Sequence, residues 1–436
     1  MDVSPVSTLR TPIDDGKHVV VSPVEKAVAY YPDEKICMPV ADGIEVRQAT
    51  SDVHPQLAPP KYADSELPER AYSPPFWKRH LLWILAGVVL LIILIGILVG
   101  LVVATHKGKS ELSHKAVVTN NTRNSVASSG LFLKDGTTWN MHLFSQNETG
   151  GINLQVSLEG GGFQPSQKVP LTITPKMGSP LSATAEQDED TGVVMINLFY
   201  LSGIHNITMS AITCASGSAK CNTISNCLLP TDVPANDNTG LTAVNVSNQK
   251  DWRVYYHDNK GFISQLQGNE SGFNTGERIG GSGLNASSIA AVNVNSTTNN
   301  VNLFYVDSSS QNLYNMQFTD GAWTTPLPIS ASPFSTWNPL SGLGAAYSVG
   351  QDQLHVYFTG TDTSIYEYVG NNASQTTNTK WINQPSRQRI WANADYAGAD
   401  VTALGWTDQV RFWQVSQGKM VQGALNNATW TETFVA

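Results

Sequence analysis

The 436-residue sequence predicts an all-β fold, a six-bladed β-propeller over residues 126–436, preceded by one transmembrane helix and a disordered N-terminal tail. Two observations support this prediction. A charge-free apolar run occupies residues 81–104, and beyond it a strand motif recurs at intervals of about fifty residues, a typical length for a propeller blade. The chain therefore divides into a tail (1–79), a span (80–105), a polar stalk (106–125) and the repeats.

The tail is predicted to be disordered. It holds half of the chain's 22 prolines and no sustained apolar periodicity, so it buries too little apolar surface to offset its ordering entropy. Within it, Pro59, Pro60 and Tyr62 form a PPxY sequence, the type that WW domains bind through a polyproline II turn. A WW-domain protein is therefore a predicted cytosolic partner.

The apolar run is expected to cross a lipid bilayer. It has no polar stripe, and at about 1.5 Å per residue it is long enough for a hydrocarbon core of about 30 Å. Gly96 and Gly100 form a GxxxG pair that allows a second helix to approach closely, so a homodimer is a predicted interaction. Lysine and arginine are balanced on the two sides of the run, so the positive-inside rule does not orient it.

The glycosylation acceptors predict the orientation of the span. The tail contains no asparagine, whereas nine Asn-x-Ser/Thr sequences lie beyond the span. We therefore expect a single-pass type II protein of the plasma membrane or secretory pathway, with its C-terminal domain outside the cell or in the lumen. The nine acceptors are Asn120, Asn147, Asn206, Asn245, Asn269, Asn285, Asn295, Asn372 and Asn427.

Composition narrows the function classes. Charged residues make up 14% of the chain and its net charge is −9; no basic patch indicates a nucleic-acid partner. Cys214, Cys221 and Cys227 lie close together on the side of the membrane where disulfides form, which predicts one local bridge and one leftover thiol without choosing the pair. No histidine lies near them, so we expect neither a metal site nor a cofactor.

Each repeat contains a strand that alternates apolar, polar, apolar and aromatic residues. A small-residue strand precedes it in most repeats, and a second alternating strand and then an aromatic residue (163, 273, 323, 381 or 430) follow. These four strands make one blade, and on this map most acceptors fall in hairpin turns, with Asn245 and Asn295 just after the first strand. A pair of β-sandwiches is the alternative. The polar positions, 49 to 56 residues apart, are His142, Asn197, Arg253, Asn302, His355 and Arg411.

The repeats resemble the fungal fucose-specific lectin family of six-bladed propellers. The resemblance implies that each sugar sits between adjacent blades, with its hydroxyls held by an arginine of the second strand and a glutamate about twelve residues later, and its apolar face against an aromatic ring of the neighbouring blade. Three blades retain part of this set. They carry Arg253 with Gln265 and Trp323, His355 with Glu367 and Trp430, and Arg411 with Gln422 and Phe163.

No blade combines the arginine with the glutamate, and a neutral acceptor in place of a charged one gives up about 1 kcal/mol or more. We therefore expect two or three weak sites for fucose or related glycans, or none. The alternative is a degenerate lectin fold that serves as a protein-interaction scaffold without sugar binding. An enzyme is not expected, because a glycosidase needs convergent carboxylates and Glu367 is the only acid on the second alternating strands.

Overall fold

The computed structural model describes residues 125–133, 139–188, 190–215, 217–247, 251–269, 272–295, 300–330, 334–374 and 379–435. Within these residues no helix is long and apolar enough to cross a membrane. The predictions that lie outside them concern the tail, the span at 80–105, the stalk, the PPxY sequence, Gly96, Gly100 and Asn120.

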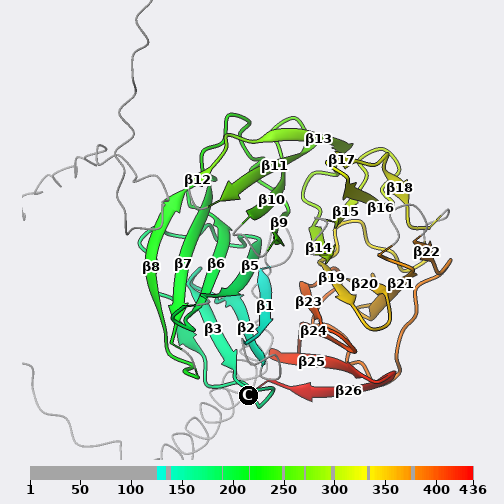
Figure 1. Ribbon diagram of the computed structural model, residues 1–436. Helices are drawn as coiled ribbons and strands as arrows, with labels where there is room; N and C mark the ends of the chain where they lie inside the picture. The colour runs from blue at the N-terminus through cyan, green and yellow to red at the C-terminus, as the bar shows by residue number, and fades with distance from the viewer. Residues whose placement is uncertain are drawn as a thin grey trace, which may run out of the picture. The chain divides into compact units, whose positions relative to one another are not determined.

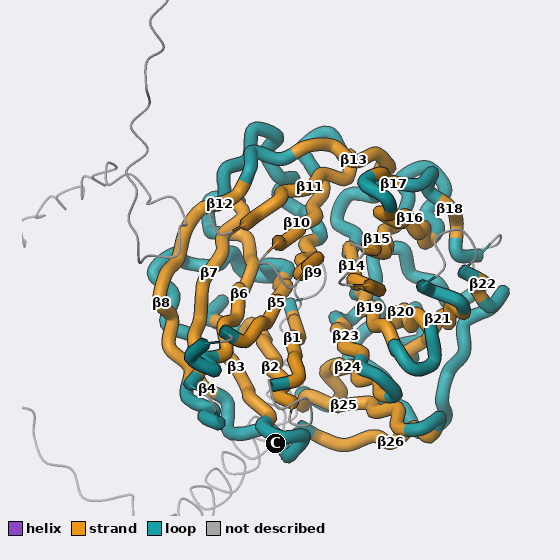
Figure 2. Tube along the Cα trace, in the orientation of Figure 1, coloured by secondary structure: helices purple, strands orange, loops and turns teal. Residues whose placement is uncertain are grey.

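The described chain forms six antiparallel sheets arranged as the blades of a ring (Figure 1). Each sheet is built from one continuous segment whose first three strands pair in chain order, and the blades follow one another around the ring in chain order (Figure 2). This confirms the predicted six-bladed propeller.

Blades 1 to 3 cover the first half of the repeats. Blade 1 consists of β1 (Val126–Phe132), β2 (Trp139–Gln146), β3 (Ile152–Ser157) and β4 (Gln167–Lys168). Blade 2 consists of β5 (Leu181–Gln187), β6 (Val194–Leu201), β7 (Ile207–Cys214) and β8 (Cys221–Leu228). Blade 3 consists of β9 (Leu241–Ser247), β10 (Asp251–His257), β11 (Phe262–Asn269), β12 (Gly272–Phe273) and β13 (Glu277–Ser282), and both β12 and β13 pair with β11.

Blades 4 to 6 complete the ring. Blade 4 consists of β14 (Ile289–Asn295), β15 (Asn300–Val306), β16 (Leu313–Thr319), β17 (Ala322–Trp323) and β18 (Leu327–Pro328). Blade 5 consists of β19 (Leu343–Ser348), β20 (Gln353–Thr359), β21 (Ile365–Asn371) and β22 (Lys380–Trp381). Blade 6 consists of β23 (Val401–Gly405), β24 (Gln409–Ser416), β25 (Lys419–Asn426) and β26 (Thr429–Phe434).

The inner strands surround a cavity of about 260 Å³ on the ring axis. Six strands converge there, and small side chains such as Gly130, Ala183, Ala243 and Ala345 line it. At Gly130 a side chain would collide with blade 6, because a Cβ there would come within 2.9 Å of the Trp406 ring. This is the physical reason for the small-residue strand that the sequence shows.

Neighbouring blades are held together by aromatic pairs. The aromatic residue of each second strand is fully buried, and in five of the six interfaces an aromatic residue of the next blade meets it edge to face, a geometry that adds about 0.5–1.5 kcal/mol to the area buried. We call these pairs the interblade clamps. They are Phe199–Phe273, Tyr255–Trp323, Phe304–Trp381, Tyr357–Trp430 and Trp413–Phe163, with ring centroids 5.6 to 6.3 Å apart and interplanar angles of 76 to 90°.

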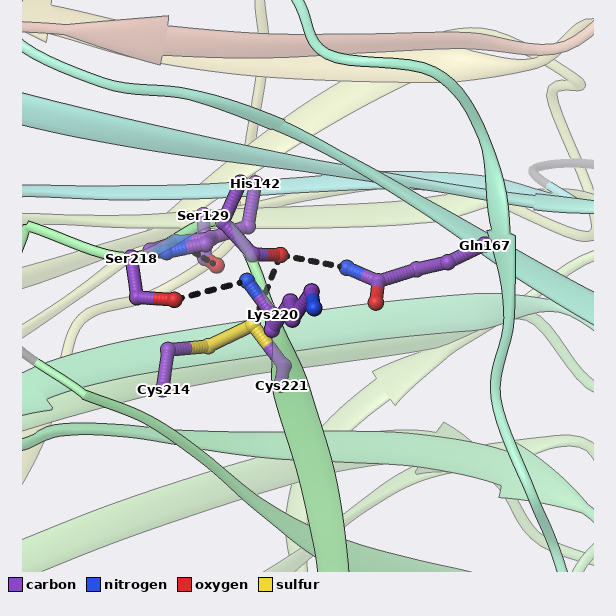
Figure 3. The surroundings of a disulfide bond; sticks show 8 residues. Ser129, His142, Gln167, Cys214, Ser218, Lys220 and Cys221 are labelled. Atoms are coloured by element: carbon purple, nitrogen blue, oxygen red, sulfur yellow. Dashed lines mark hydrogen bonds between the residues drawn. A yellow bond between two sulfur atoms is a disulfide. The ribbon is translucent and has the colours of Figure 1, made fainter.

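The interface between blades 1 and 2 uses a disulfide loop instead. Cys214 and Cys221 are bonded, and the hydrophobic cluster that contains Cys214 also contains Phe144, the buried aromatic residue of blade 1. Gln167 of β4 donates from Nε2 to the carbonyl of Ala219 in this loop at 2.7 Å (Figure 3). The predicted local bridge is therefore formed between the first two cysteines of the cluster.

Two details of the repeat map need correction. Cys227 is buried and is not free, so the leftover thiol is not found among the described residues. Phe163 makes an isolated bridge with Ser157 and lies outside the outer strand of its blade, which is β4.

Candidate functional site

Of the three predicted polar pairs, the structure brings only His355 and Glu367 into direct side-chain contact. In blade 3, Arg253 lies opposite Gln267, while Gln265 lies opposite Tyr255. In the other two blades, too, the predicted third-strand partner lies opposite the clamp aromatic residue, two positions after the polar residue it was expected to pair with. Glu367 lies opposite Tyr357, with His355 opposite Val369, and Gln422 lies opposite Trp413, with Arg411 opposite Ala424.

Arg253 of β10 is held by its own blade. Its side chain is 7% exposed, and its guanidinium forms an ion pair with Asp251, two residues earlier on the same strand face. With its amide oxygen turned toward the guanidinium, Gln267 accepts from Nη1 and Nη2 at 3.2 and 3.1 Å. The guanidinium is thus directed away from Gln265.

A second set of polar groups lies beside the Tyr255–Trp323 clamp between blades 3 and 4. Gln265 is buried, and its Nε2 donates to Oε1 of Glu277 at 3.3 Å. Glu277 begins the edge strand β13 opposite Gln265 and is exposed. The indole of Trp323 is half-buried, so a carboxylate, an amide and an accessible aromatic ring lie at one interface.

The Tyr255 hydroxyl belongs to this set. It is buried and has no hydrogen-bond partner within the described chain. Burial raises the pKa of Tyr255, while Arg253 acts in the opposite direction. A neutral hydroxyl at a buried position without a partner is a donor that a ligand hydroxyl would satisfy.

The interface between blades 5 and 6 contains the only carboxylate predicted on a third strand. Oε1 of Glu367 accepts from the Tyr357 hydroxyl at 2.7 Å and lies 2.8 Å from Nδ1 of His355. His355 and Glu367 are 2% and 3% exposed. Backbone bonds in both directions tie Ser386 to Glu367, and Trp391 packs against Tyr357 and against the half-buried Trp430. The segment after β22 therefore covers this interface.

Arg411 of β24 is surrounded by neutral acceptors. It donates to the carbonyls of Val410 and Leu425 at 3.1 Å, and to the side-chain oxygens of Gln409 and Asn426 at 2.7 and 2.9 Å. Burial lowers the pKa of Arg411 to about 10, which leaves it charged at neutral pH. Its guanidinium also lies 5.9 Å from the Trp139 ring of blade 1, so it joins the last blade to the first.

Among the described residues, Gln422 forms no hydrogen bond with this guanidinium. Its Oε1 instead accepts from Nε1 of Trp413 at 3.1 Å, and Trp413 is the partner of Phe163 in the clamp between blades 6 and 1. The structure therefore divides the predicted trio of Arg411, Gln422 and Phe163 into a blade-bridging arginine and a separate aromatic contact.

Two of the remaining interfaces carry neutral polar groups. Between blades 4 and 5, Oδ1 of Asn302 accepts from Asn315 at 3.2 Å and from Gln317 at 3.0 Å, and Gln317 reaches Thr379 of the next blade. Between blades 1 and 2, burial lowers the pKa of His142 to about 4, so this residue is neutral above that pH. Among the described residues no group of His, Cys, Asp or Glu is arranged to hold a metal ion.

The structure places the described acceptor asparagines at strand ends and in turns, with one exception. Asn147, Asn206 and Asn427 lie in turns between strands, and Asn285 lies between β13 and β14. Asn245, expected after the first strand, lies within β9 opposite Trp252, and its Nδ2 points to Glu186 at 3.5 Å. A glycan attached to Nδ2 of Asn245 would disrupt the contact with Glu186 and the packing of β9.

Sequence reasoning missed Glu277, the carboxylate that the interface between blades 3 and 4 contains. Glu277 lies on β13, a second edge strand after the expected outer strand; blade 4 repeats this arrangement in β18, where Leu327 lies opposite Asn315. Asp251 and Gln267, the partners of Arg253, could have been found from strand alternation, because they occupy the same strand face two residues before Arg253 and directly opposite it.

No protein-family model and no curated protein sequence matches this chain. Solved structures do: AofleA from Arthrobotrys oligospora is similar with a TM-score of 0.54 and 19% identity, over 72% of this chain and 87% of that one. A lectin from Aleuria aurantia, described as a six-bladed β-propeller with a novel fucose recognition mode, gives 0.53 and 13%, over 72% and 96%. A Hadza microbial sialidase gives 0.44 and 10%, over 72% and 66%. The similarity to the first two establishes the six-bladed propeller fold.

Proposed function

We propose that this chain is a single-pass type II membrane glycoprotein whose propeller binds fucosylated or related glycans weakly, at the groove between blades 3 and 4. The observation that carries the proposal is the Gln265–Glu277 pair beside the half-buried Trp323 and the unpartnered Tyr255 hydroxyl. The propeller fold shared with a fucose-specific lectin of Aleuria aurantia supports it. The membrane anchor rests on the apolar run and on the one-sided distribution of glycosylation acceptors.

Each group has a role that follows from its chemistry. The Glu277 carboxylate accepts hydrogen bonds from two sugar hydroxyls, and its exposure on an edge strand leaves it free to turn toward a ligand. Tyr255 is fully buried, so its hydroxyl donates to a ring or hydroxyl oxygen only if the Trp323 ring moves aside. The CH-rich face of the sugar rests on the Trp323 indole. Arg253 acts at a distance, by holding β10 and β11 together through Asp251 and Gln267.

The binding is weak for a structural reason. The two cations that the family resemblance assigns to sugar hydroxyls, Arg253 and Arg411, are buried and fully engaged with their own blades. A sugar in either groove gains no charge-assisted donor unless these contacts break, and buried ion contacts are costly to break. A single groove with one carboxylate and one aromatic ring remains.

A glycan array probed with the full chain in detergent tests this proposal. We expect fucosylated glycans to give signals that fall by about fivefold in Glu277→Gln, because a neutral acceptor loses about 1 kcal/mol against a charged one. Trp323→Ala should abolish the signal. Glu159→Gln, which removes another exposed carboxylate in a turn of blade 1, is the matched control and should bind like the parent chain.

A second function is favoured by the closure of the other grooves. The clamps, the contact of Arg411 with Trp139 and the segment that covers Glu367 occupy interfaces where the family resemblance places sugars, as expected of a protein-interaction scaffold with this fold. An array that stays silent for every sugar at high valency would favour this scaffold over the lectin. Its partner would then be sought among proteins that bind the folded chain and, for the tail, among WW-domain proteins.

A further inference from the structure

The two faces of the ring carry different loops. Because neighbouring strands in each blade are antiparallel, the loops that lead into the inner strands share one face with the turns between the second and third strands. We call this the first face. The turns between inner and second strands, and between third and outer strands, form the second face.

The second face carries glycosylation acceptors next to blades 5 and 6. The acceptors Asn372 and Asn427 follow third strands on this face. A surface that carries glycans is suited to water.

On the first face, blades 5 and 6 expose large apolar side chains next to basic ones. Phe434 is 62% exposed and Ile390 50%, with Leu340 and Tyr396 at 39% and 37%. The turn that carries Leu340 packs on the loop that carries Tyr396, because Gly342 donates to the carbonyl of Gly398 at 3.2 Å. The blade 5–6 patch is defined as Leu340, Ile390, Tyr396, Phe434, Arg389 and Lys419.

The basic residues belong to the patch and not to internal ion pairs. Nζ of Lys419 lies 5.8 Å from the Phe434 ring, and Arg389 is exposed. Neither residue forms an ion pair with another described residue. Carboxylates nearby are engaged elsewhere: Asp395 accepts from the backbone of Gly418 at 2.9 Å, and Glu432 accepts from the backbone of Ala392 at 2.8 Å.

The chain enters the propeller on this same face. Ser125 precedes β1 and its hydroxyl donates to the carbonyl of Ser179, in the loop that leads into β5, at 3.1 Å. Blade 1 adjoins blade 6 in the ring, as the contact of Arg411 with Trp139 shows. The acceptors on the first face, Asn147, Asn206 and Asn285, belong to blades 1 to 3 and the loop after them, so the described part of blades 5 and 6 carries none there.

We propose that the blade 5–6 patch rests on the surface of the bilayer that anchors the chain. The inference rests on the proposed membrane span, which ends at residue 104, so that the short segment 105–124 tethers the first face to the lipid. Apolar and tyrosine side chains at such a surface enter the headgroup region, and arginine and lysine pair with lipid phosphates. Each contact is weak, but the tether keeps the patch at a high effective concentration near the lipid, so that the contacts together favour the bound state. The second face, with its glycans, then points away from the membrane.

Fluorescence quenching in vesicles tests the proposal. The full chain is inserted into phosphatidylcholine vesicles with and without brominated acyl chains, and the spectrum of the parent chain is subtracted from that of Ile390→Trp. We expect the added tryptophan to lose fluorescence in brominated vesicles. Val349→Trp is the matched control, because Val349 is a 59% exposed apolar residue after β19 on the second face, and it should show no loss.

Three outcomes would overturn the proposal. Equal quenching of both variants would mean that no face is preferred. Absence of quenching at position 390, together with a concentration-dependent dimer that Phe434→Ser disrupts, would assign the patch to a second copy of the chain. A chain that does not float with the vesicles at all would remove the anchor and the patch contact together, whereas glycan binding at Glu277 would be unaffected.

Discussion

Two fully buried histidines should make the propeller lose stability as the pH falls. Burial lowers the pKa of His142 and of His257 to about 4 from the ordinary value of 6.5. Nδ1 of His257 accepts from the backbone of Gly240 at 3.1 Å, and Nδ1 of His142 lies 3.4 Å from the Ser129 hydroxyl, while the Nε2 atom of each has no partner among the described residues. Asp258 beside His257 and the hydrogen bond of His142 to Ser129 act in the opposite direction, but burial has the larger effect at both sites.

The sign and size of the effect follow from proton linkage. Both rings are neutral in the folded chain, so between about pH 6.5 and pH 4 the unfolded chain binds more protons, and stability is lost as the pH falls through this window. A pKa lowered by about 2.5 units corresponds to about 3 kcal/mol per histidine at full protonation, of which about 2 kcal/mol is already lost near pH 5.

His142→Asn isolates one of these contributions. Blades 2 and 4 carry asparagine at the equivalent position, Asn197 and Asn302, so the fold accommodates this side chain. Urea unfolding of parent and variant, near pH 7.5 and near pH 5, should show that the variant loses about 2 kcal/mol less than the parent over this interval. His205→Asn, at a half-exposed surface histidine, is the control. Parallel pH profiles for parent and His142→Asn would refute the reasoning.

Two further predictions concern packing between elements. Gly283→Ala places a Cβ against Cδ2 and Nε2 of His257, which should lower the free energy of unfolding by about 1–3 kcal/mol; Gly162→Ala, where a Cβ meets nothing within 4 Å, is the control, and equal melting temperatures would contradict the prediction. Replacing Cys214 and Cys221 together by serine opens a loop with a sequence separation of 7, for which chain entropy gives a loss of about 2.5 kcal/mol; calorimetry of the double variant that shows no loss would mean that the loop is held by its packing alone.

The blade map could be predicted because it depends on local alternation. Each second strand has an aromatic residue two positions after a polar one, and this local pattern is visible in the sequence of all six blades. The chain spacing between repeats then fixed the number of blades. Short edge strands such as β4 and β18 left no such pattern, so the outer boundary of each blade was the part most open to error.

The site could not be predicted in the same way, because residue spacing does not determine strand register. Twelve residues separate Arg253 from Gln265, but the turn between β10 and β11 places Gln265 opposite Tyr255. The partners that satisfy a buried arginine come from whichever residues the register brings opposite, here Gln267 and Asp251. Glu277 was beyond reach for another reason: its strand, with two glycines in Glu-Arg-Ile-Gly-Gly-Ser, has no strand-like alternation.

The exchange of an aromatic residue for a disulfide between blades 1 and 2 shows what sequence could and could not supply. The absence of the outer aromatic in the second repeat and the presence of three cysteines were both visible in the sequence. That Cys214 and Cys221 fill the space of the missing ring, beside Phe144, required the packing of β7 against blade 1.

A crystal structure of the chain soaked with methyl fucoside decides whether the interface between blades 3 and 4 binds sugar. The account predicts density for the sugar between blades 3 and 4, with a hydroxyl on the Glu277 carboxylate and the ring on Trp323, and little or none at the other five interfaces. Empty grooves throughout, or a sugar bound beside Arg253 or Arg411 with those guanidinium groups released from their blades, would contradict it.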